Sequence, residues 1–163
     1  MRYHRIGENG NKVKSKRAAG IFFTDGTHVL LLKRSGESSH SGTWALPGGG
    51  ARAGETDIGT AVRETREETG LEAIPGYRID SLSSQDGHKH FTTFVYRVPS
   101  RFDVNLSEEH SDWEWVPFPN LSNKNLHPKF EENLPRYLKA VRRKITSFSE
   151  WVEFTTACDL LAD

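Results

Sequence analysis

The sequence predicts an α/β domain with a mixed central sheet, and three observations support this fold class. Two apolar runs, 18–23 and 28–34, flank an Asp25-Gly26 turn, which is the sequence pattern of a β-hairpin. A run of aromatic and β-branched residues at 89–98 predicts a further strand. Helical patterns lie between and after the strands, so helices and strands interleave along the chain. Because one pair of strands is a hairpin, we expect the sheet to be mixed.

A helix is predicted over residues 55–69, where suitable residues mark both ends. Thr56 can cap the N-terminus, and Asp57 favours the positive end of the helix dipole. Gly70 follows the last turn and ends the helix, as glycine commonly does. Apolar and small residues recur at helical spacing inside this segment, which gives the helix a face that can pack on a core.

The second half of the chain contains fewer signals. Residues 72–88 have mixed character and carry no predicted element. A short strand is predicted at 113–116, and the prolines after it break the pattern. A helix is predicted over 128–144. We expect Pro135 to interrupt this helix, because proline lacks a backbone donor and clashes with the preceding turn.

Composition limits the classes of protein to consider. A length of 163 residues fits one domain, and 22 acidic residues balance 22 basic ones, so the chain has no general attraction for nucleic acid or anionic membrane. The single cysteine, Cys158, cannot form an intrachain disulfide, which suits a reducing cytosol. The longest aliphatic run, 29–32, is far too short to span a bilayer. A cytoplasmic protein is therefore expected.

The two ends of the chain differ from the domain predicted over 17–144. Residues 1–16 are polar and basic, and we interpret them as a solvated, partly mobile arm rather than a nucleic-acid contact. Residues 145–163 carry apolar side chains that require burial. This extension packs either on the domain or against a second subunit, as in a homodimer.

Acidic residues concentrate in the helix predicted at 55–69. Glu64, Glu67 and Glu68 project within one sector of roughly 100°, because about 3.6 residues make a helical turn. Like charges at this spacing repel, whereas divalent cations such as Mg²⁺, Mn²⁺ or Ca²⁺ bind such oxygen ligands. The alternative is a solvated acidic face paired with Arg63 and Arg66. A glycine turn at 48–50, just before the helix, favours a ligand site, because glycine lets the backbone approach closely.

The segment 49–71 resembles the Nudix box, G-x5-E-x7-R-E-U-x-E-E-x-G-U, where U is a bulky aliphatic residue. The positions that match are Gly49, Glu55, Arg63, Glu64, Glu67, Glu68, Gly70 and Leu71. Thr65 departs from the pattern at the first U position, although its methyl group can still pack. Trp44-Ala45-Leu46-Pro47-Gly48 also resembles the usual lead-in to the box.

The resemblance implies an α/β/α sandwich that cleaves a diphosphate linkage with the help of Mg²⁺, or of Mn²⁺. Glu64, Glu67 and Glu68 would hold the metal, and Glu64 or a later glutamate would activate the attacking water. The carbonyl of Gly49 would be a further ligand. Glu55 and Arg63 would pair with each other and join the loop to the helix. Bound cations suit this chemistry because they neutralise phosphate charge and lower the pKa of water.

Outside the box, candidate residues are less well defined. Glu109 is expected to supply an extra carboxylate ligand, with a solvated loop pair with Glu108 as the alternative. Arg34 and Arg52 are expected to contact phosphate oxygens, and their alternative is surface solvation. The candidates for base recognition are Trp44, Asn120 and His127. For an aromatic residue on a strand, such as Trp44, the alternative is a place in the core.

These residues predict a pyrophosphohydrolase acting on a nucleoside triphosphate or related nucleotide. Alternatives within the class are hydrolases of nucleotide sugars, dinucleoside polyphosphates or capped RNA. Apart from a capped RNA end, nucleic acid is not an expected partner. A different class is a Nudix-fold module that binds a ligand without turnover, which the intact acids of the box disfavour. Specificity lies in loops outside the box, so the substrate stays open at this stage.

Overall fold

The computed structural model describes residues 3–6, 12–14 and 16–144, with side chains from residue 16 onward. Its centre is a seven-stranded sheet with the path β5-β4-β3-β8-β7, in which β6 pairs with β3 and β9 with β4. The strands are β3 (Lys16–Thr24), β4 (His28–Arg34), β5 (Trp44–Ala45), β6 (Gly48–Gly50), β7 (Tyr77–Asp86), β8 (Lys89–Arg97) and β9 (His110–Pro117).

The sheet is mixed, as the sequence predicts. Strands β3 and β8 run parallel over the whole register from Lys16↔Lys89 to Thr24↔Arg97. Strand β7 pairs antiparallel with β8 and lies at the edge of the sheet. Strand β7 was not predicted, because most of its side chains are polar and exposed to solvent. An edge strand can be polar in this way, since one side of it has no neighbouring strand.

The predicted hairpin is present, but its strands separate almost at once. Asp25 closes the turn by accepting hydrogen bonds from the backbone N–H of Thr27 (2.9 Å) and His28 (2.8 Å). The Cα register pairs Thr24 with Val29. Beyond that point β6 pairs with β3, and β5 pairs with β4. The sheet therefore divides into two halves that meet at the hairpin.

Helix α1 (Asp57–Thr69) has the capping residues that the sequence predicts, Thr56 and Gly70. The Thr56 hydroxyl accepts a hydrogen bond from the backbone N–H of Gly59 at 3.1 Å, which satisfies one of the free donors of the first turn. Gly70 ends the helix in the left-handed conformation, with φ of 74°. The helix begins two residues later than predicted, because Glu55 belongs to the preceding loop.

Helix α2 (Pro128–Arg143) is continuous, so the predicted interruption at Pro135 is wrong. Pro135 lies on the exposed face of the helix, where water can reach the backbone carbonyl that loses its partner. Phe130 and Tyr137, on either side of the proline, are both buried against the sheet. Packing on the sheet holds the helix together despite the missing hydrogen bond. A short 3₁₀ helix, η1 (Phe118–Asn123), joins β9 to this part of the chain.

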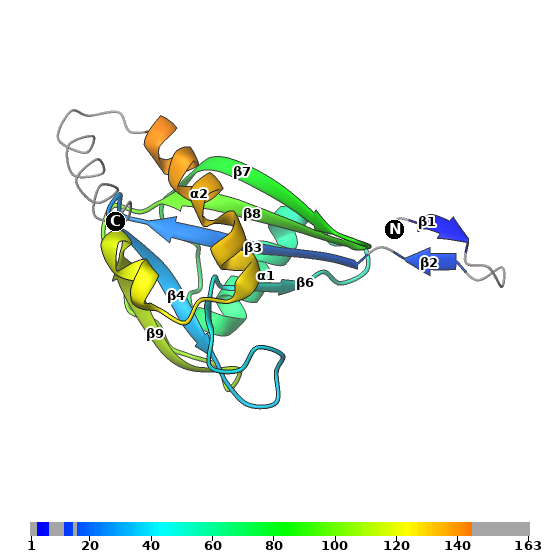
Figure 1. Cartoon of the computed structure of the whole chain (residues 1–163), viewed down its shortest axis with the longest axis horizontal. Coiled ribbons are helices and arrows are strands. Elements are labelled where there is room, and N and C mark those ends of the chain that lie inside the picture. Colours follow the sequence, from blue (N-terminus) through cyan, green and yellow to red (C-terminus); the bar gives the residue numbers. More distant parts are fainter. Residues whose placement is uncertain (1–2, 7–11, 15, 145–163) are drawn as a thin grey trace.

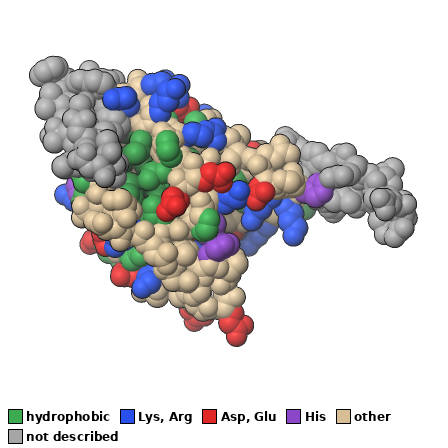
Figure 2. Space-filling view, in the orientation of Figure 1, with side chains coloured by type: hydrophobic (Ala, Val, Ile, Leu, Met, Phe, Trp, Pro, Cys, Tyr) green, Lys and Arg blue, Asp and Glu red, His purple; other side chains and the backbone are tan. Residues whose placement is uncertain are grey.

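The two helices cover opposite faces of the sheet, which confirms the α/β/α sandwich (Figure 1). Alternate residues of β3 point to opposite faces: Phe22 enters the core under α2, whereas Ile21 and Phe23 enter the core under α1. Figure 2 shows Lys and Arg side chains gathered over the C-terminal end of α2, where Arg142 and Arg143 complement the helix dipole.

The predicted ends of the chain lie partly outside the described residues. Within the expected arm 1–16, β1 (Tyr3–Ile6) and β2 (Lys12–Lys14) pair antiparallel as a separate ribbon, which the sequence did not predict. The extension 145–163 is not among the described residues, so its packing stays a prediction. Among the helices that the structure describes, none combines the length and apolar character needed to cross a membrane.

Gly20 tests the packing of β3 against the segment before β6. A Cβ atom at this position would lie 2.5 Å from the carbonyl oxygen of Pro47, which is held by a 3.0 Å hydrogen bond from the N–H of Ile21. We expect Gly20→Ala to lower the free energy of unfolding by about 1–3 kcal/mol, as measured by urea denaturation. Gly50→Ala is the matched control, because a Cβ there meets no atom within 4 Å. Equal stability of the two variants would contradict this packing.

Candidate functional site

The glycine turn and the acidic helix meet where β6 lies against β3. Gly48, Gly49 and Gly50 pair with consecutive residues of β3, and α1 packs across them. A Cβ on Gly49 would lie 2.5 Å from the carboxyl carbon of Glu64. Glycine at this position therefore lets the Glu64 carboxylate lie directly against the backbone.

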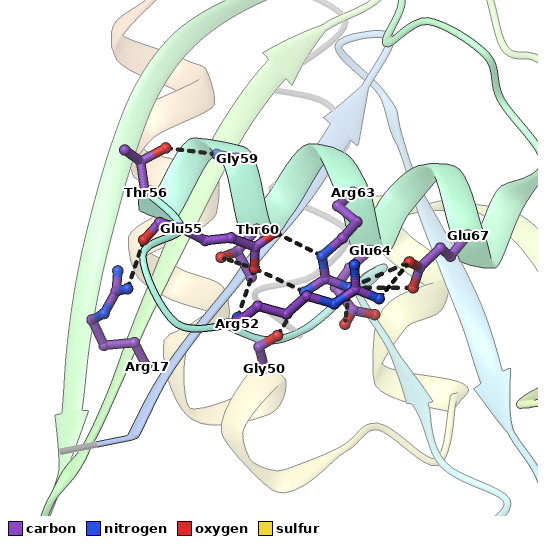
Figure 3. Close-up of polar contacts among 10 residues, drawn as sticks. All are labelled: Arg17, Gly50, Arg52, Glu55, Thr56, Gly59, Thr60, Arg63, Glu64 and Glu67. Carbon is purple, nitrogen blue, oxygen red and sulfur yellow. Dashed lines mark hydrogen bonds and ion pairs between the residues drawn. The ribbon is translucent and has the colours of Figure 1, made fainter. Parts of the chain in front are cut away.

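Arg63 lies at the centre of the acidic cluster (Figure 3). Its guanidinium donates to both carboxylate oxygens of Glu55, at 2.7 and 3.0 Å, so the predicted pair between these residues is present. The same group donates to Glu64 at 2.9 Å and to the carbonyl of Gly50 at 2.9 Å. It also contacts Glu67 at 3.3 Å. One cation thus holds three carboxylates and the glycine turn together.

Glu55 is fixed as an anion by these contacts. Hydrogen bonds from Arg63, and then from the N–H of Arg52 at 2.7 Å, lower the pKa of Glu55 to about 2. The hydroxyl of Thr60 donates to the same carboxylate at 3.1 Å. Glu55 is therefore ionised at neutral pH and has no free proton to exchange. Its geometry suits a structural support of the loop, as the sequence predicts.

Arg17, which sequence reasoning missed, anchors the same loop to β3. Its guanidinium donates to the carbonyl of Glu55 at 2.6 Å and to the carboxylate of Asp57 at 2.7 Å. Its own carbonyl accepts from the N–H of Ala51 at 2.8 Å. Both ends of the loop are thus held by one residue. No local pattern around Arg17 indicates this role, because the contacts span about forty positions of sequence.

Glu68 differs from its neighbours because it is buried, with 4% of its surface exposed. One carboxylate oxygen accepts a hydrogen bond from the N–H of Gly48 at 2.7 Å. Burial, with the negative charges of Glu64 and Glu109 beside it, raises the pKa of Glu68 to about 8. A buried carboxylate near other carboxylates is costly in the absence of a cation, so this environment favours a metal ligand.

Glu109 lies close to Glu68, although the two residues come from different parts of the chain. It is exposed in the turn before β9, where its carbonyl accepts a hydrogen bond from the N–H of Ser35 at 3.1 Å. Glu68, Glu109 and His110 each offer a ligand atom, and these atoms all lie within 4.8 Å of one another. His110 was missed at the sequence level. It directly follows a predicted ligand at the start of a strand, and that adjacency was the signal available.

The donors in this region fit a divalent cation. Glu64, Glu67, Glu68 and Glu109 supply hard oxygen ligands of the kind that Mg²⁺ and Mn²⁺ select. Arg63 offsets part of the negative charge of Glu55 and Glu64. It makes no such ion pair with the buried Glu68 among the described contacts. The roles of the individual glutamates and of the Gly49 carbonyl as ligands stay predictions.

The two predicted phosphate contacts occupy different positions. Arg52 has 68% of its side chain exposed and lies 3.5 Å from Glu67, at the rim of the acidic cluster. The guanidinium of Arg34 donates to the carbonyl of Ser39 at 2.9 Å, and its charge acts on both Glu68 and His110. Both arginines are therefore close enough to the acids to face a phosphate group bound there.

The three residues assigned to base recognition are not equally accessible. Trp44 is 7% exposed and belongs to the core under α2, with the ammonium of Lys124 4.2 Å from its ring centre. Its environment agrees with the core alternative. Asn120 is exposed on η1. His127 caps α2 by accepting from the N–H of Lys129 at 3.1 Å, and its ring lies 4.5 Å from that of His40.

The capping role of His127 predicts a pH dependence of stability. Burial, followed by the charges of His40 and nearby basic groups, lowers the pKa of His127 from 6.5 to about 4. In the unfolded chain the ring gains a proton below about pH 6.5, whereas the folded protein resists this until about pH 4. Stability from this group is therefore complete above pH 6.5 and is lost as the pH falls through this window.

We expect the Tm of the wild-type protein to fall further between pH 6.5 and 4 than that of His127→Asn, by at least about 2 °C. Asparagine keeps an acceptor at the helix cap but does not titrate. Thermal melts of both proteins across this range measure the difference, and groups common to both cancel. Parallel pH profiles would contradict the assignment.

Gly49→Ala tests the contact between the glycine turn and Glu64. The added Cβ would meet the flexible end of Glu64, so the carboxylate moves while the fold stays intact. We expect Mn²⁺ affinity, measured by an electron paramagnetic resonance titration, to fall roughly 10–100-fold with little change in Tm. Gly50→Ala keeps its carbonyl and meets no atom, so it should bind Mn²⁺ like the wild type. Unchanged affinity in Gly49→Ala would refute the proposed geometry.

Comparisons with known proteins agree with this arrangement. Residues 14–140 match the family model of the NUDIX domain. Putative 8-oxo-dGTP diphosphatase 3 of Mycobacterium tuberculosis is 34% identical over 130 residues, which cover 73% of this chain and 60% of that protein. The asymmetrical bis(5'-nucleosyl)-tetraphosphatase of Mus musculus is 36% identical over 95 residues, which cover 53% of this chain and 62% of that protein. The chain thus spans about 60% of the length of each of these relatives.

Solved structures show the same fold. The Nudix hydrolase RenU of M. smegmatis superposes with a TM-score of 0.65 and 27% identity, over 86% of this chain and 94% of that chain. An Ap4A hydrolase of C. elegans has a TM-score of 0.62 at 23% identity, over 80% of this chain and 99% of that chain, and supports the fold alone. Since the family model matches most of the sequence, the chain belongs to the Nudix family.

Proposed function

We propose that this chain is a divalent-cation-dependent pyrophosphohydrolase that cleaves a diphosphate linkage in a nucleoside triphosphate or related nucleotide. The observation that carries the proposal is the meeting of Glu68 from α1 with Glu109 from the turn before β9, beside the glycine turn against which Glu64 rests. Acids that form only a solvated helix face would not require a further acid from a separate element to lie beside them. The related diphosphatase and tetraphosphatase support a nucleotide as substrate.

The proposed division of roles follows from burial and hydrogen bonding. Glu68 suits the role of a metal ligand, because its carboxylate is buried and held by the Gly48 N–H, where little bulk water can solvate its charge. The cation, Mg²⁺ or Mn²⁺, would supply charge neutralisation of the diphosphate and a more acidic water. Glu64 and Glu67, with 16% and 49% of their side chains exposed, are the candidates to accept the proton of the attacking water.

Two arginines would orient the phosphate chain. Arg52 projects from the loop that Glu55 holds, and Arg34, at the end of β4, pairs with His110 of the neighbouring strand β9. A planar guanidinium can bind two phosphate oxygens at once, so these residues would select a charged substrate and align it. Asn120 and His127 would contact the nucleoside, whereas Trp44 would support them from the core. We also propose a cytoplasmic location, which the single cysteine in the sequence supports.

A substrate screen tests the proposal. The full chain is incubated with Mg²⁺ and 8-oxo-dGTP, the common nucleoside triphosphates, a dinucleoside tetraphosphate, a nucleotide sugar or capped RNA, and cleaved products are measured. We expect turnover that EDTA abolishes. Glu67→Gln and Glu68→Gln should each lose more than about 100-fold in kcat/KM, which exceeds the loss expected when a residue that only supports a metal ligand is changed. Glu72→Gln, an exposed acid just after α1, is the matched control and should keep activity.

Three outcomes would overturn the proposal. Near-normal turnover in both variants would remove the assigned glutamates from the site. Turnover that persists in EDTA would remove the cation. Tight nucleotide binding without any product from the whole panel would instead identify a binding module of the same fold.

A further inference from the structure

We propose that Nε2 of His110 is a nitrogen ligand of the divalent cation, beside Glu68 and Glu109. The inference rests on the proposed function, because it assumes that a cation binds at this cluster. It goes further in assigning a mixed oxygen and nitrogen donor set, which the glutamate-rich box does not contain.

The spacing of the atoms fits a shared cation. Nε2 of His110 lies 3.5 Å from Oε2 of Glu68, at the long limit of a hydrogen bond. Two ligands that each bind one cation at about 2.1 Å are roughly 3.0–3.4 Å apart at octahedral or tetrahedral angles. The observed separation is close to that edge length. Glu109 also offers a carboxylate oxygen within 4.8 Å of a ligand atom of each of these residues, so three donors lie close together.

The surroundings of Nδ1, the other ring nitrogen of His110, indicate the tautomer in which Nδ1 carries the proton. His110 is 9% exposed, and its Nδ1 is buried without a hydrogen-bond partner among the described residues. The hydroxyl of Ser107 is also buried and unpartnered within the same part of the chain. The two residues share one turn, closed by a 3.4 Å hydrogen bond from the His110 N–H to the Ser107 carbonyl. A water molecule between Nδ1–H and the Ser107 hydroxyl would satisfy both groups and would leave the lone pair on Nε2.

Hydrogen bonds hold the backbone that carries His110 in place before any ligand binds. His110 pairs with Arg34 across the antiparallel β4–β9 ladder. The adjoining turn is tied to Ser35, whose N–H donates to the Glu109 carbonyl at 3.1 Å and whose hydroxyl donates to the Glu108 carbonyl at 3.2 Å. A ligand on a fixed strand end loses little freedom when it binds a metal.

A nitrogen ligand changes which metal the site prefers. Mg²⁺ favours oxygen ligands almost exclusively, whereas imidazole suits later divalent metals, and Mn²⁺ accepts both kinds of donor. A site that contains His110 should therefore bind Mn²⁺ more tightly, relative to Mg²⁺, than a site made of carboxylates alone.

Pulsed electron paramagnetic resonance of the Mn²⁺-loaded full chain tests the ligand directly. We expect electron spin-echo modulation from a directly bound ¹⁴N nucleus, replaced by a ¹⁵N pattern when the histidines of the wild-type protein carry ¹⁵N-labelled rings. This measurement needs no variant and so does not depend on how a substitution folds. Bound Mn²⁺ without histidine nitrogen modulation would overturn the proposal, even if the protein turns over nucleotides normally.

Calorimetric titration of His110→Gln gives a second readout. We expect Mn²⁺ affinity to fall about tenfold or more, the Mg²⁺ affinity to fall much less, and the nitrogen modulation to vanish. His28→Gln, at the hairpin turn, is the matched control and should bind both metals like the wild type. Equal losses for both metals would show that His110 only positions Glu68 and would overturn the ligand assignment. Absence of any metal binding together with EDTA-resistant turnover would instead overturn the proposed function itself.

Discussion

The repulsion among closely spaced carboxylates is the constraint on which the site depends. Five glutamates converge here, and Arg63 holds three of them by direct contacts. Those contacts keep Glu55 ionised and hold α1 against the glycine turn. Glu68 lies on the far side, where burial raises its pKa. The site therefore has two parts. The guanidinium of Arg63 stabilises the carboxylates of one part, and the other part, which contains Glu68, suits a bound metal cation.

Backbone geometry allows this crowding. Gly49 lacks the Cβ that would strike Glu64, and the N–H of Gly48 stabilises Glu68. Arg17 then fixes both ends of the loop that carries Glu55, through its guanidinium and its carbonyl. Strand β3 thus supports the site in two ways: it pairs with the glycine turn, and it supplies the arginine that anchors the loop. Such support orients side chains before a ligand arrives.

Local chemistry explains which features the sequence could predict. Thr56 and Gly70 mark the ends of α1 because caps act within one turn, and the resemblance to the Nudix box implied the pairing of Glu55 with Arg63. Strand β7 escaped prediction because an edge strand needs little apolar patterning. Continuity through Pro135 depends on packing of distant residues. Arg17 anchors the loop through tertiary contacts that no spacing along the chain encodes, whereas the one sequence signal for His110 was its position directly after Glu109.

The early separation of β3 from β4 has a mechanical consequence. Helix α1 packs on β3 and β6, whereas Glu109 and His110 belong to the half-sheet of β4 and β9. The candidate ligands therefore sit on opposite sides of a seam that backbone pairing bridges at Thr24 and Val29. An ion bound by residues of both parts would link the two parts of the sheet. Occupancy of the site and rigidity of the whole sheet would then rise and fall together.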